Sequence, residues 1–439
     1  MTNANSPTAV RETAADLLKE IAKEREALIK AGKMKKAKPL PEITEDEIPY
    51  AIPENWEWVR LGDVCNKLTD GTHHSPTNTT KGDYKYITAK NIKKHGIDLS
   101  DITYVSNEIH KEIYSRCNPV KGDVLIIKDG ATTGVATINT LEEEFSLLSS
   151  VALLKPPLGI DAQYLVYMFE SPSSQQYIKD DMAGAAITRL TITKLEKFPF
   201  PLPPLSVQKR IVALLDELLS RIDKARENIE KNIENAEELY ENSVETVFAE
   251  FEEEYRCVRL SDVCHYDKIK NTTPNLPYVG LEHIESNTGK FLGELTPTEV
   301  LSSTFHFSDT HLLYGRLRPY LNKALLPTFE GHCSTEIFPI SVHEEITREY
   351  LFYWITKKSI VKRIDETWTG ARMPRANMNI VLEFELPIPP LKKQQEIVST
   401  LDKIKENKEH LLSAYTKKLQ ALDELRNSVL EKAFRGELT

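Results

Sequence analysis

Two long stretches of the chain place apolar residues at intervals of three or four positions. The first has Ile211, Leu215, Leu218, Ile222, Ala225 and Ile229, with polar Asn232 on the same face. The second has Ile397, Leu401, Ile404, Leu411, Tyr415, Leu419, Leu422, Leu425 and Val429, with Lys408 and Lys418 on the same face. Heptad spacing over about four or five heptads predicts two helices of about 45 residues, each roughly 65 Å long. We expect them to pair as an antiparallel coiled coil, and the alternative is that each packs on its own domain.

The regions before these helices show a different pattern, with short β-type runs between turn residues. Examples are YKYITAKNI (84–92), GDVLII (122–127), SSVALL (149–154) and LPYVGLEHI (276–284). Helical stretches are mixed in, such as AQYLVYMFESPSSQQYI (162–178). The pattern predicts mixed domains of strands and helices. The aromatic residues at helical spacing are expected in the cores: Tyr164, Tyr167, Tyr350, Tyr353 and Trp354.

The chain repeats itself. At an offset of 186 residues, PLPPLSVQKRIVALLDEL (201–218) corresponds to PIPPLKKQQEIVSTLDKI (387–404). Upstream, VRLGDVC (59–65) returns as VRLSDVC (258–264), so the first copy is 13 residues longer. In both copies a proline cluster, which cannot continue into a helix interior, separates the mixed domain from its helix.

The fold class that follows is α+β, with two tandem mixed α/β domains joined by long helices that form an antiparallel coiled coil. A helix from Thr13 to Lys30, stopped at Gly32, is expected ahead of the first copy. The expected parts are an N-terminal helix and linker (1–50), a first domain (51–205), a central helix (206–250), a second domain (251–391) and a C-terminal helix (392–435).

The composition excludes some classes of protein but does not identify the function. The net charge of −10 argues mildly against a nucleic-acid partner. However, residues 206–254 hold 6 basic and 14 acidic residues and so account for most of this charge, which leaves both mixed domains near neutral. No apolar run reaches the roughly 18 residues that a membrane helix requires. The 5 cysteines have no CxxC spacing, which indicates free, mostly buried thiols in a reducing cytoplasm and no zinc site.

The sequence lacks the catalytic motifs of several enzyme classes. The sequence contains no Asp/Asn-Pro-Pro-aromatic motif of an adenine methyltransferase, no glycine-rich S-adenosylmethionine loop and no GxxxxGK[ST] phosphate loop. His73 and His74 are neighbours, which on a strand would point to opposite faces and would not form a metal site. We therefore expect a non-catalytic protein with no cofactor or metal of its own.

The motifs that are present resemble those of the specificity subunit of type I restriction–modification systems. The resemblance is carried by WEWVRLGDV (56–64) with its second copy, by TGARMPRAN (369–377), by GRLRPYLNK (315–323) and by the twice-used proline motif followed by Q-x-x-I-V-x-x-L-D. It covers nearly all of residues 51–435. Residues 1–50 resemble an N-terminal extension found in part of that family.

The resemblance implies that each mixed domain is a target recognition domain that reads one half of a split double-stranded DNA sequence. It also implies that the helices set the half-site spacing and dock two methyltransferase subunits, which restriction subunits join. S-adenosylmethionine, ATP and magnesium would then belong to the partners. The implied place of action is the cytoplasm, with no membrane contact.

Candidate DNA contacts are cations, amides and hydroxyls in the loops of the two domains, because such groups reach base edges and phosphates. They are Lys90, Asn91, Lys93, Lys94, Lys128, Thr132, Thr133, Arg189, Arg316, Arg318, Arg372 and Arg375. Arg189 and Arg375 correspond in the repeat. A residue shared by both copies distinguishes two half-sites poorly, so these two are better assigned to phosphate or framework contacts.

Two other classes stay open at this point. A stand-alone DNA-binding regulator would have no need of duplicated docking helices. A coiled-coil scaffold that binds only proteins would give the two domain interiors no reason to diverge while their frameworks stay alike.

Overall fold

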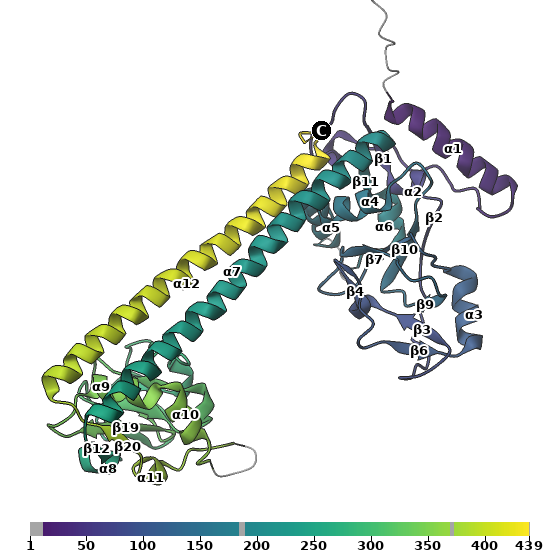
Figure 1. The fold of residues 1–439 in the computed structure, drawn as a ribbon. Coiled ribbons are helices and arrows are strands. Elements are labelled where there is room, and N and C mark those ends of the chain that lie inside the picture. The colour runs from purple at the N-terminus through teal and green to yellow at the C-terminus, as the bar shows by residue number, and fades with distance from the viewer. Residues whose placement is uncertain (1–11, 184–188, 369–372, 439) are drawn as a thin grey trace, which may run out of the picture. The chain divides into compact units, whose positions relative to one another are not determined.

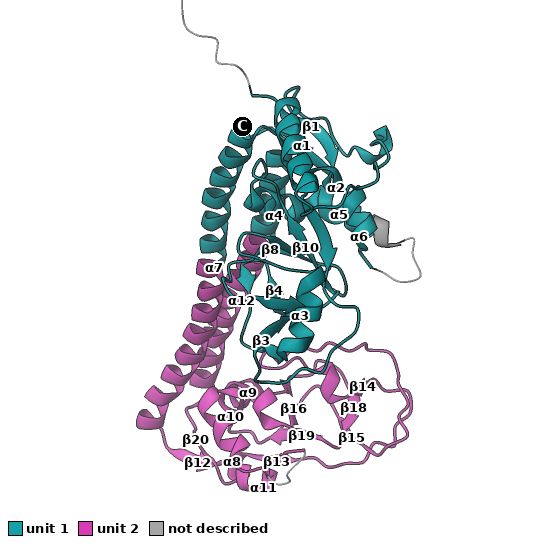
Figure 2. Ribbon diagram, turned by 90° about the vertical axis from the view of Figure 1, so that its right-hand side faces the viewer, with its two compact units in different colours: residues 1–226, 420–439 teal, residues 227–419 magenta. Residues whose placement is uncertain are grey.

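The computed structural model describes residues 12–183, 189–368 and 373–438. The chain divides into two compact units (Figure 2). Unit 1 contains residues 1–226 and 420–439, and unit 2 contains residues 227–419. Each unit therefore includes one mixed domain and a section of both long helices.

Unit 1 begins with helix α1 (Ala14–Lys30), as the sequence predicts. The hydroxyl of Thr13 accepts a hydrogen bond from the backbone N–H of Asp16, which caps the first turn. Gly32, with a φ of 68°, follows the last turn in the left-handed conformation that glycine adopts readily. Ala14, Leu17 and Ile21 are buried in the core of the unit, so α1 packs on the first mixed domain.

The strands of unit 1 are β1 (Glu57–Arg60), β2 (Lys67–Asp70), β3 (Tyr84–Ile87), β4 (Ile92–Lys93), β5 (Gly96–Ile97), β6 (Thr103–Val105), β7 (Val124–Ile127), β8 (Ala136–Ile138), β9 (Phe145–Leu147), β10 (Val151–Lys155) and β11 (Pro199–Leu202). Its short helices are η1 (Glu45–Glu47), α2 (Leu61–Val64), η2 (Ala89–Asn91), α3 (Asn107–Arg116), α4 (Ala162–Glu170), α5 (Pro172–Ala183) and α6 (Ile192–Lys197). The helical stretch expected at 162–178 thus divides into α4 and α5, because Pro172 begins a new helix.

A four-stranded antiparallel sheet of order β2-β10-β7-β8 lies at the centre of unit 1. Along β7, Val124 and Ile126 face one hydrophobic cluster, while Leu125 and Ile127 face another. Alternate side chains of a strand point to opposite faces, so this sheet is buried on both sides. A second sheet has the order β6-β3-β9, and β1 pairs with β11.

Unit 2 repeats this plan. Its strands are β12 (Cys257–Arg259), β13 (Cys264–Tyr266), β14 (Tyr278–Val279), β15 (Thr304–Phe307), β16 (Leu312–Gly315), β17 (Ala324–Leu325), β18 (Gly331–Ser334), β19 (Ile337–Val342) and β20 (Glu385–Pro387). Its short helices are α8 (Leu260–Val263), η3 (Leu281–His283), η4 (Pro319–Leu321), α9 (Arg348–Thr356), α10 (Lys358–Asp365) and α11 (Met378–Val381). The central sheet has the order β13-β19-β16-β17 and again separates two clusters, so β16 and β19 take the places of β7 and β10.

The long helices are α7 (Leu205–Glu254) and α12 (Leu391–Phe434) (Figure 1). In unit 1, the start of α7 lies beside the end of α12, with Ile211 and Phe434 in one core and an ion pair between Arg226 and Asp423. In unit 2, the end of α7 lies beside the start of α12, with Phe248 and Leu401 in one core. The two helices form the expected antiparallel coiled coil.

The seam between the helices differs from the expectation at a few positions. Asn232, Leu411, Lys418 and Leu425 are exposed, whereas Ile233 and Leu412 are partly buried, as is the expected Leu419. A straight α-helix drifts against a strict seven-residue repeat, so the buried face moves on by one residue. Lys408 does face α7: its Nζ lies 4.0 Å from the ring centre of Tyr240, and burial lowers the pKa of this lysine.

The repeated sequence motifs correspond to repeated contacts. The buried amide of Gln208 accepts the N–H of Asp161 at 2.9 Å and donates to the carbonyls of Gly159 and Pro203. Gln394 makes the same three contacts with Thr347, Glu345 and Pro389 in unit 2. The repeated glutamine therefore ties the proline cluster and the following helix to the mixed domain.

Two repeated tyrosines complete this junction. The hydroxyls of Tyr164 and Tyr350 donate to the carbonyls of Pro201 and Pro387, both at 2.9 Å. Both of these residues are fully buried, Tyr353 and Trp354 are buried beside them in unit 2, and Tyr167 packs against the core of unit 1. The expectation that these aromatic residues are core residues is confirmed.

The cysteines also agree with the expectation. All five are free thiols, and four of them are buried, while Cys257 is exposed.

Candidate nucleic-acid interface

The arginines predicted in unit 2 lie on two loops that the backbone joins. Arg316 follows β16, and its N–H donates to the carbonyl of Glu336 at 2.9 Å, while its carbonyl accepts the N–H of Ala376 at 2.8 Å. The N–H of Arg318 donates to the carbonyl of Pro374 at 2.8 Å. The structure thus brings GRLRPYLNK and the end of TGARMPRAN together at one end of the central sheet. Arg372 lies outside the described residues.

The carboxylate of Glu336 lies between two of these arginines. Its Oε2 accepts from the Nε of Arg316 at 3.0 Å, and its Oε1 accepts from the Nε and Nη2 of Arg375 at 2.9 and 2.8 Å. Partial burial opposes ionisation of the carboxyl, but the hydrogen bond from Arg375 and the charges of both arginines outweigh it and lower the pKa of Glu336. The two guanidinium groups are therefore held in fixed positions around one anion.

Arg318 is placed differently. Its φ of 53° lies in the left-handed region, which is uncommon for a residue with a side chain, and Asn322 at the other end of the turn has a φ of 47°. The amide of Asn322 donates to the carbonyl of Thr356 at 2.9 Å, which ties the turn to α9. Arg318 itself is exposed. Strain of this kind persists only where surrounding contacts enforce it, and functional sites are frequent places for it.

Unit 1 has the same backbone arrangement with other side chains. The N–H of Lys128 donates to the carbonyl of Ser150 at 2.8 Å, and its carbonyl accepts the N–H of Leu190 at 3.0 Å. Lys128 is thus the counterpart of Arg316, and Arg189 is the counterpart of Arg375. Arg189 is half exposed and forms an ion pair with Asp129 at 2.7 Å.

Lys128 is not at the surface. It is only 3% exposed, and its Nζ donates to Asp70 Oδ2 at 2.6 Å. The same carboxylate also binds Arg116, and His73 lies 3.3 Å from it. Direct contact with DNA is therefore not expected of Lys128. Its role here is to neutralise a buried carboxylate, while Arg116 is the exposed cation of the cluster.

The basic segment at 90–94 lies next to this cluster. The N–H of Ala89 donates to the hydroxyl of Ser150, the residue whose carbonyl accepts from Lys128. Asn91 is 2% exposed, accepts the N–H of Thr88 at 3.1 Å and donates to the carbonyl of Asp98 at 3.0 Å, so it stabilises its own turn and is not expected to reach DNA. Lys93 and Lys94 are exposed in the β4–β5 hairpin.

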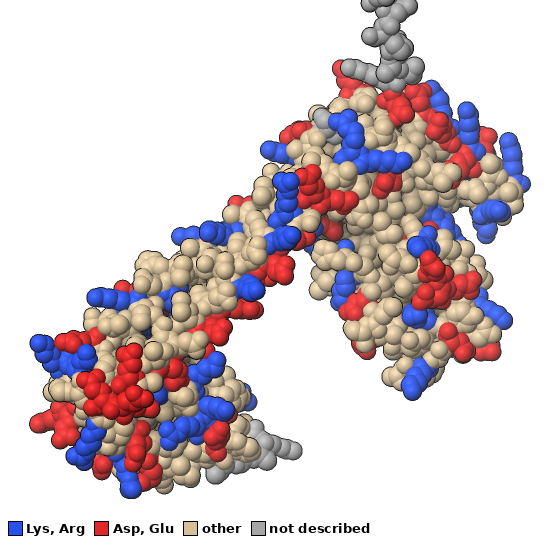
Figure 3. All heavy atoms as spheres, viewed as in Figure 1, with Lys and Arg blue, Asp and Glu red and all other residues tan. Residues whose placement is uncertain are grey.

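The remaining candidates are surface groups. Lys90 is exposed and forms an ion pair with Asp101 at 2.7 Å. Thr132 is exposed, and the hydroxyl of Thr133 donates to the carbonyl of Gly130 at 2.8 Å. On the face shown in Figure 3, lysine and arginine side chains alternate with acidic ones and do not gather in one large basic patch. Most candidate cations are therefore presented next to a carboxylate.

A comparison with known protein families decides the relationship. The family described as "Type I restriction modification DNA specificity domain" matches residues 53–235 and again residues 252–420. The chain belongs to this family. The resemblance drawn from the sequence motifs is confirmed, and both copies of the repeat are members.

Curated relatives agree with this assignment. The Escherichia coli type I restriction enzyme EcoDI specificity subunit is 31% identical over 183 residues, which are 41% of this chain and 41% of that protein. The EcoKI specificity subunit of E. coli strain K12 is 22% identical over 436 residues, which are 88% of this chain and 90% of that one. The chain thus spans about two fifths of the first relative that it matches and most of the second.

A solved structure shares the fold. A chain from a structure described as the basis of complex assembly and conformational transition of the type I R-M system has a TM-score of 0.70 and 19% identity. It covers 88% of this chain, and all of that chain is matched. The similarity supports the fold of two specificity domains with long paired helices.

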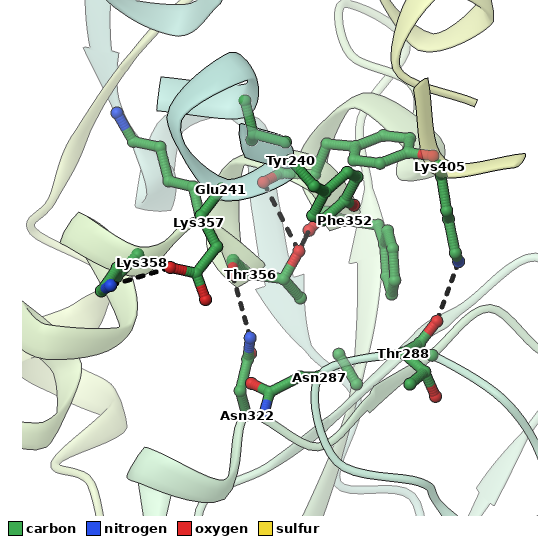
Figure 4. Close-up of a pocket in the computed structure, with 14 residues that line it drawn as sticks. Tyr240, Glu241, Asn287, Thr288, Asn322, Phe352, Thr356, Lys357, Lys358 and Lys405 are labelled. Carbon is green, nitrogen blue, oxygen red and sulfur yellow. Dashed lines mark hydrogen bonds and ion pairs between the residues drawn. The ribbon is translucent and has the colours of Figure 1, made fainter. Parts of the chain in front are cut away.

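A small pocket of the second specificity domain lies beside Asn322, the residue at the end of the Arg318 turn (Figure 4). It encloses about 40 Å³ and is lined by residues that include Tyr240, Asn287, Asn322, Phe352 and Lys405. Lys405 donates to the carbonyl of Thr288 at 2.8 Å, and Lys358 forms an ion pair with Glu241 at 2.8 Å. A space of this size holds one or a few water molecules and is too small for a typical ligand, so we interpret the pocket as part of the domain's packing.

Sequence reasoning missed Arg116 and Glu336 in these specificity domains. Neither lies in a motif, because Arg116 meets Asp70 across 46 residues and Glu336 meets Arg375 across 39. An alignment of the two copies could have found the strand-end position that Lys128 and Arg316 share.

Among the residues that the structure describes, no group of three or more His, Cys, Asp and Glu side chains is arranged to hold a metal ion. Within the same ranges, no helix is both long and apolar enough to cross a membrane.

Proposed function

We propose that this chain is the DNA-reading subunit of a type I restriction–modification complex. Each specificity domain reads one half of a bipartite double-stranded DNA target, and the chain itself catalyses nothing. S-adenosylmethionine, ATP and magnesium serve its partner subunits. The complex works in the cytoplasm, where it meets both host and foreign DNA.

One observation carries the proposal. The two domains share the backbone arrangement at the end of the central sheet and an arginine on its second loop, yet the strand end carries Lys128 and Asp129 in one copy and Arg316 and Leu317 in the other. A common framework with different side chains suits two readers of two different half-sites. A protein-only scaffold gives no reason for such divergence.

Within this proposal, the exposed and partly exposed candidates, together with Arg116, contact DNA directly. They are Lys90, Lys93, Lys94, Arg116, Thr132, Thr133, Arg189, Arg316, Arg318 and Arg375. Arg318, held on a strained turn, is assigned to base edges. Arg189 and Arg375, which correspond in the two copies, are assigned to phosphates or to the framework.

The paired helices set the distance between the half-sites and dock two methyltransferase subunits, and restriction subunits join that assembly. The repeated junctions at Gln208 and Gln394 support two equivalent docking places. The acidic exposed residues Glu237 and Glu238 of α7 suit a basic partner surface.

Modification-sensitive sequencing tests the proposal. DNA is taken from cells that express this chain together with its methyltransferase subunit. The expected result is one adenine-methylated motif of two parts with an unspecified gap. Replacing residues 255–385 with the interior of another family member should change one half of the motif only. A stable complex that leaves no such motif would contradict the proposal.

A further inference from the structure

Both specificity domains hold a carboxylate between two cations at the same end of the central sheet. In unit 2, Glu336 binds Arg316 and Arg375. In unit 1, Asp70 binds Lys128 and Arg116. Because Lys128 and Arg316 occupy equivalent backbone positions, the two clusters correspond in space within their domains.

The two carboxylates do not correspond in the repeat. Glu336 precedes β19, and the residue in its place in unit 1 is Ser150, as the hydrogen bonds from Arg316 and Lys128 show. Asp70 is instead the last residue of β2. The same charge arrangement is therefore built from two different positions of the shared framework, so the backbone plan alone does not account for it.

An internal carboxylate has a definite effect on DNA binding. It reduces the local charge that phosphates meet from +2 to about +1, and sequence-independent affinity depends on that charge through counterion release. It also fixes the arginines: Arg316 uses its Nε for Glu336, and the guanidinium has two further nitrogens with which to donate. A bidentate contact to a guanine needs this kind of fixed orientation.

We propose that Glu336 is a positioning residue for specificity, which holds Arg316 for base readout, keeps Arg375 in its phosphate or framework position and at the same time weakens sequence-independent binding. In unit 1, Asp70 restrains the exposed Arg116 in the same way, while its second partner, Lys128, is buried. The inference rests on the DNA-reading function proposed above. It predicts that removing the negative charge strengthens non-specific binding, which loss of structure would not do.

The test compares the wild-type chain with Glu336→Gln, each in complex with the methyltransferase subunit. Fluorescence anisotropy measures binding to a duplex of scrambled sequence, about 30 bp long, between about 50 and 300 mM salt. We expect the variant to bind about 3- to 10-fold more tightly near 150 mM, with a log–log salt slope steeper by about 0.9. On a duplex with the methylated motif, discrimination against the scrambled sequence should fall about 10-fold.

Two controls separate charge from shape. Glu336→Asp keeps the charge but shortens the side chain, so non-specific binding should stay the same while discrimination falls. Glu344→Gln removes an exposed negative charge elsewhere in the same unit and should change neither quantity. If Glu336→Gln loses its thermal transition, Asp70→Asn, which releases Arg116 in unit 1, carries the same expectation.

The outcomes are distinct. Folded Glu336→Gln, or its substitute Asp70→Asn, with unchanged or weaker non-specific binding would overturn this inference and leave the DNA-reading function standing. A wild-type complex that binds no duplex in a salt-dependent way would overturn both.

Discussion

The carboxylate of Glu245 on α7 caps the N-terminus of α10 by accepting the N–H and the hydroxyl of Ser359 at 2.6 and 2.8 Å. In unit 1, Glu431 on α12 binds the N–H and hydroxyl of Ser173 at the start of α5 in the same way. Each mixed domain is thus held by the helix that follows it at the proline junction and by the final turns of the other long helix. This arrangement explains why the repeat extends to both ends of the helices.

Loss of this cap should destabilise unit 2. In Glu245→Ala, two hydrogen bonds to the first turn of α10 disappear. The buried Lys357 also loses its ion pair with Glu245, while its ion pair with Glu252 remains. We expect a cost of about 1–3 kcal/mol in the free energy of unfolding. Urea unfolding followed by circular dichroism measures it. Glu250→Ala, at an exposed position of the same helix, should have almost no effect.

The repeated glutamine Gln394 should contribute more to the stability of unit 2 than its neighbour Gln395. Gln394 is fully buried with three hydrogen bonds, whereas Gln395 is more accessible. Gln394→Ala leaves buried backbone groups without partners and should lower stability by about 2–4 kcal/mol, against less than about 0.5 kcal/mol for Gln395→Ala. Thermal unfolding compares the two variants. Equal effects would show that the junction does not depend on this amide.

Attachment of the N-terminal segment should depend on pH. Hydrogen bonds from Arg60 lower the pKa of Glu47 to about 2, and Arg60 also donates to the carbonyls of Pro41, Glu42 and Lys197. Since the folded pKa lies below the ordinary value of 4.5, the pair stabilises the folded state above about pH 4.5 and loses this contribution as the pH falls toward 2.

Limited proteolysis of the segment at residues 31–50 measures this attachment. Cleavage should accelerate as the pH is lowered from about 5 to about 3 with an acid-active protease, and Glu47→Gln should be cleaved faster already at about pH 5. Arg259→Ala provides the matched control, because Arg259 is the counterpart of Arg60 in unit 2 and its ion pair with Glu383 is exposed to solvent. A pH-independent difference between wild type and Glu47→Gln would contradict the assignment.

Charge on α7 should affect assembly with the methyltransferase subunit. Glu241 already binds Lys358, so the exposed Glu237 and Glu238 are the residues to reverse. We expect the double charge reversal, Glu237→Lys with Glu238→Lys, to reduce co-purification at least several-fold at low salt. The same reversal at Glu250 and Glu253 serves as control. Undiminished complex formation would place the docking surface elsewhere.

DNA binding by the complex should weaken steeply as salt rises, because phosphate contacts release counterions. Arg318→Ala should reduce discrimination at one or two positions of one half-site and leave the other half unchanged. A titration over a salt series, followed by sequencing of the methylated motif, measures both. A flat salt profile would remove the basis of the DNA assignment.

The sequence by itself determined the repeat, the two long helices and their pairing, and the core tyrosines. These features follow from local periodicity and from motifs whose spacing is constant between copies, such as Gln208 and Gln394. They could be predicted because burial of one helical face requires apolar residues at fixed intervals.

Only the tertiary structure decided which polar residues reach the surface. Lys128 and Asn91 are of residue types that often contact DNA, yet both side chains are buried. Their partners could not be read from the spacing of residues in the sequence. The register of the coiled-coil seam, where Leu412 replaces Leu411, depends on how two helices cross. The pairing of Arg375 with Glu336 joins strands and loops 39 residues apart. Such contacts are set by the packing of the whole domain, and the charge of a side chain in isolation does not determine its partner.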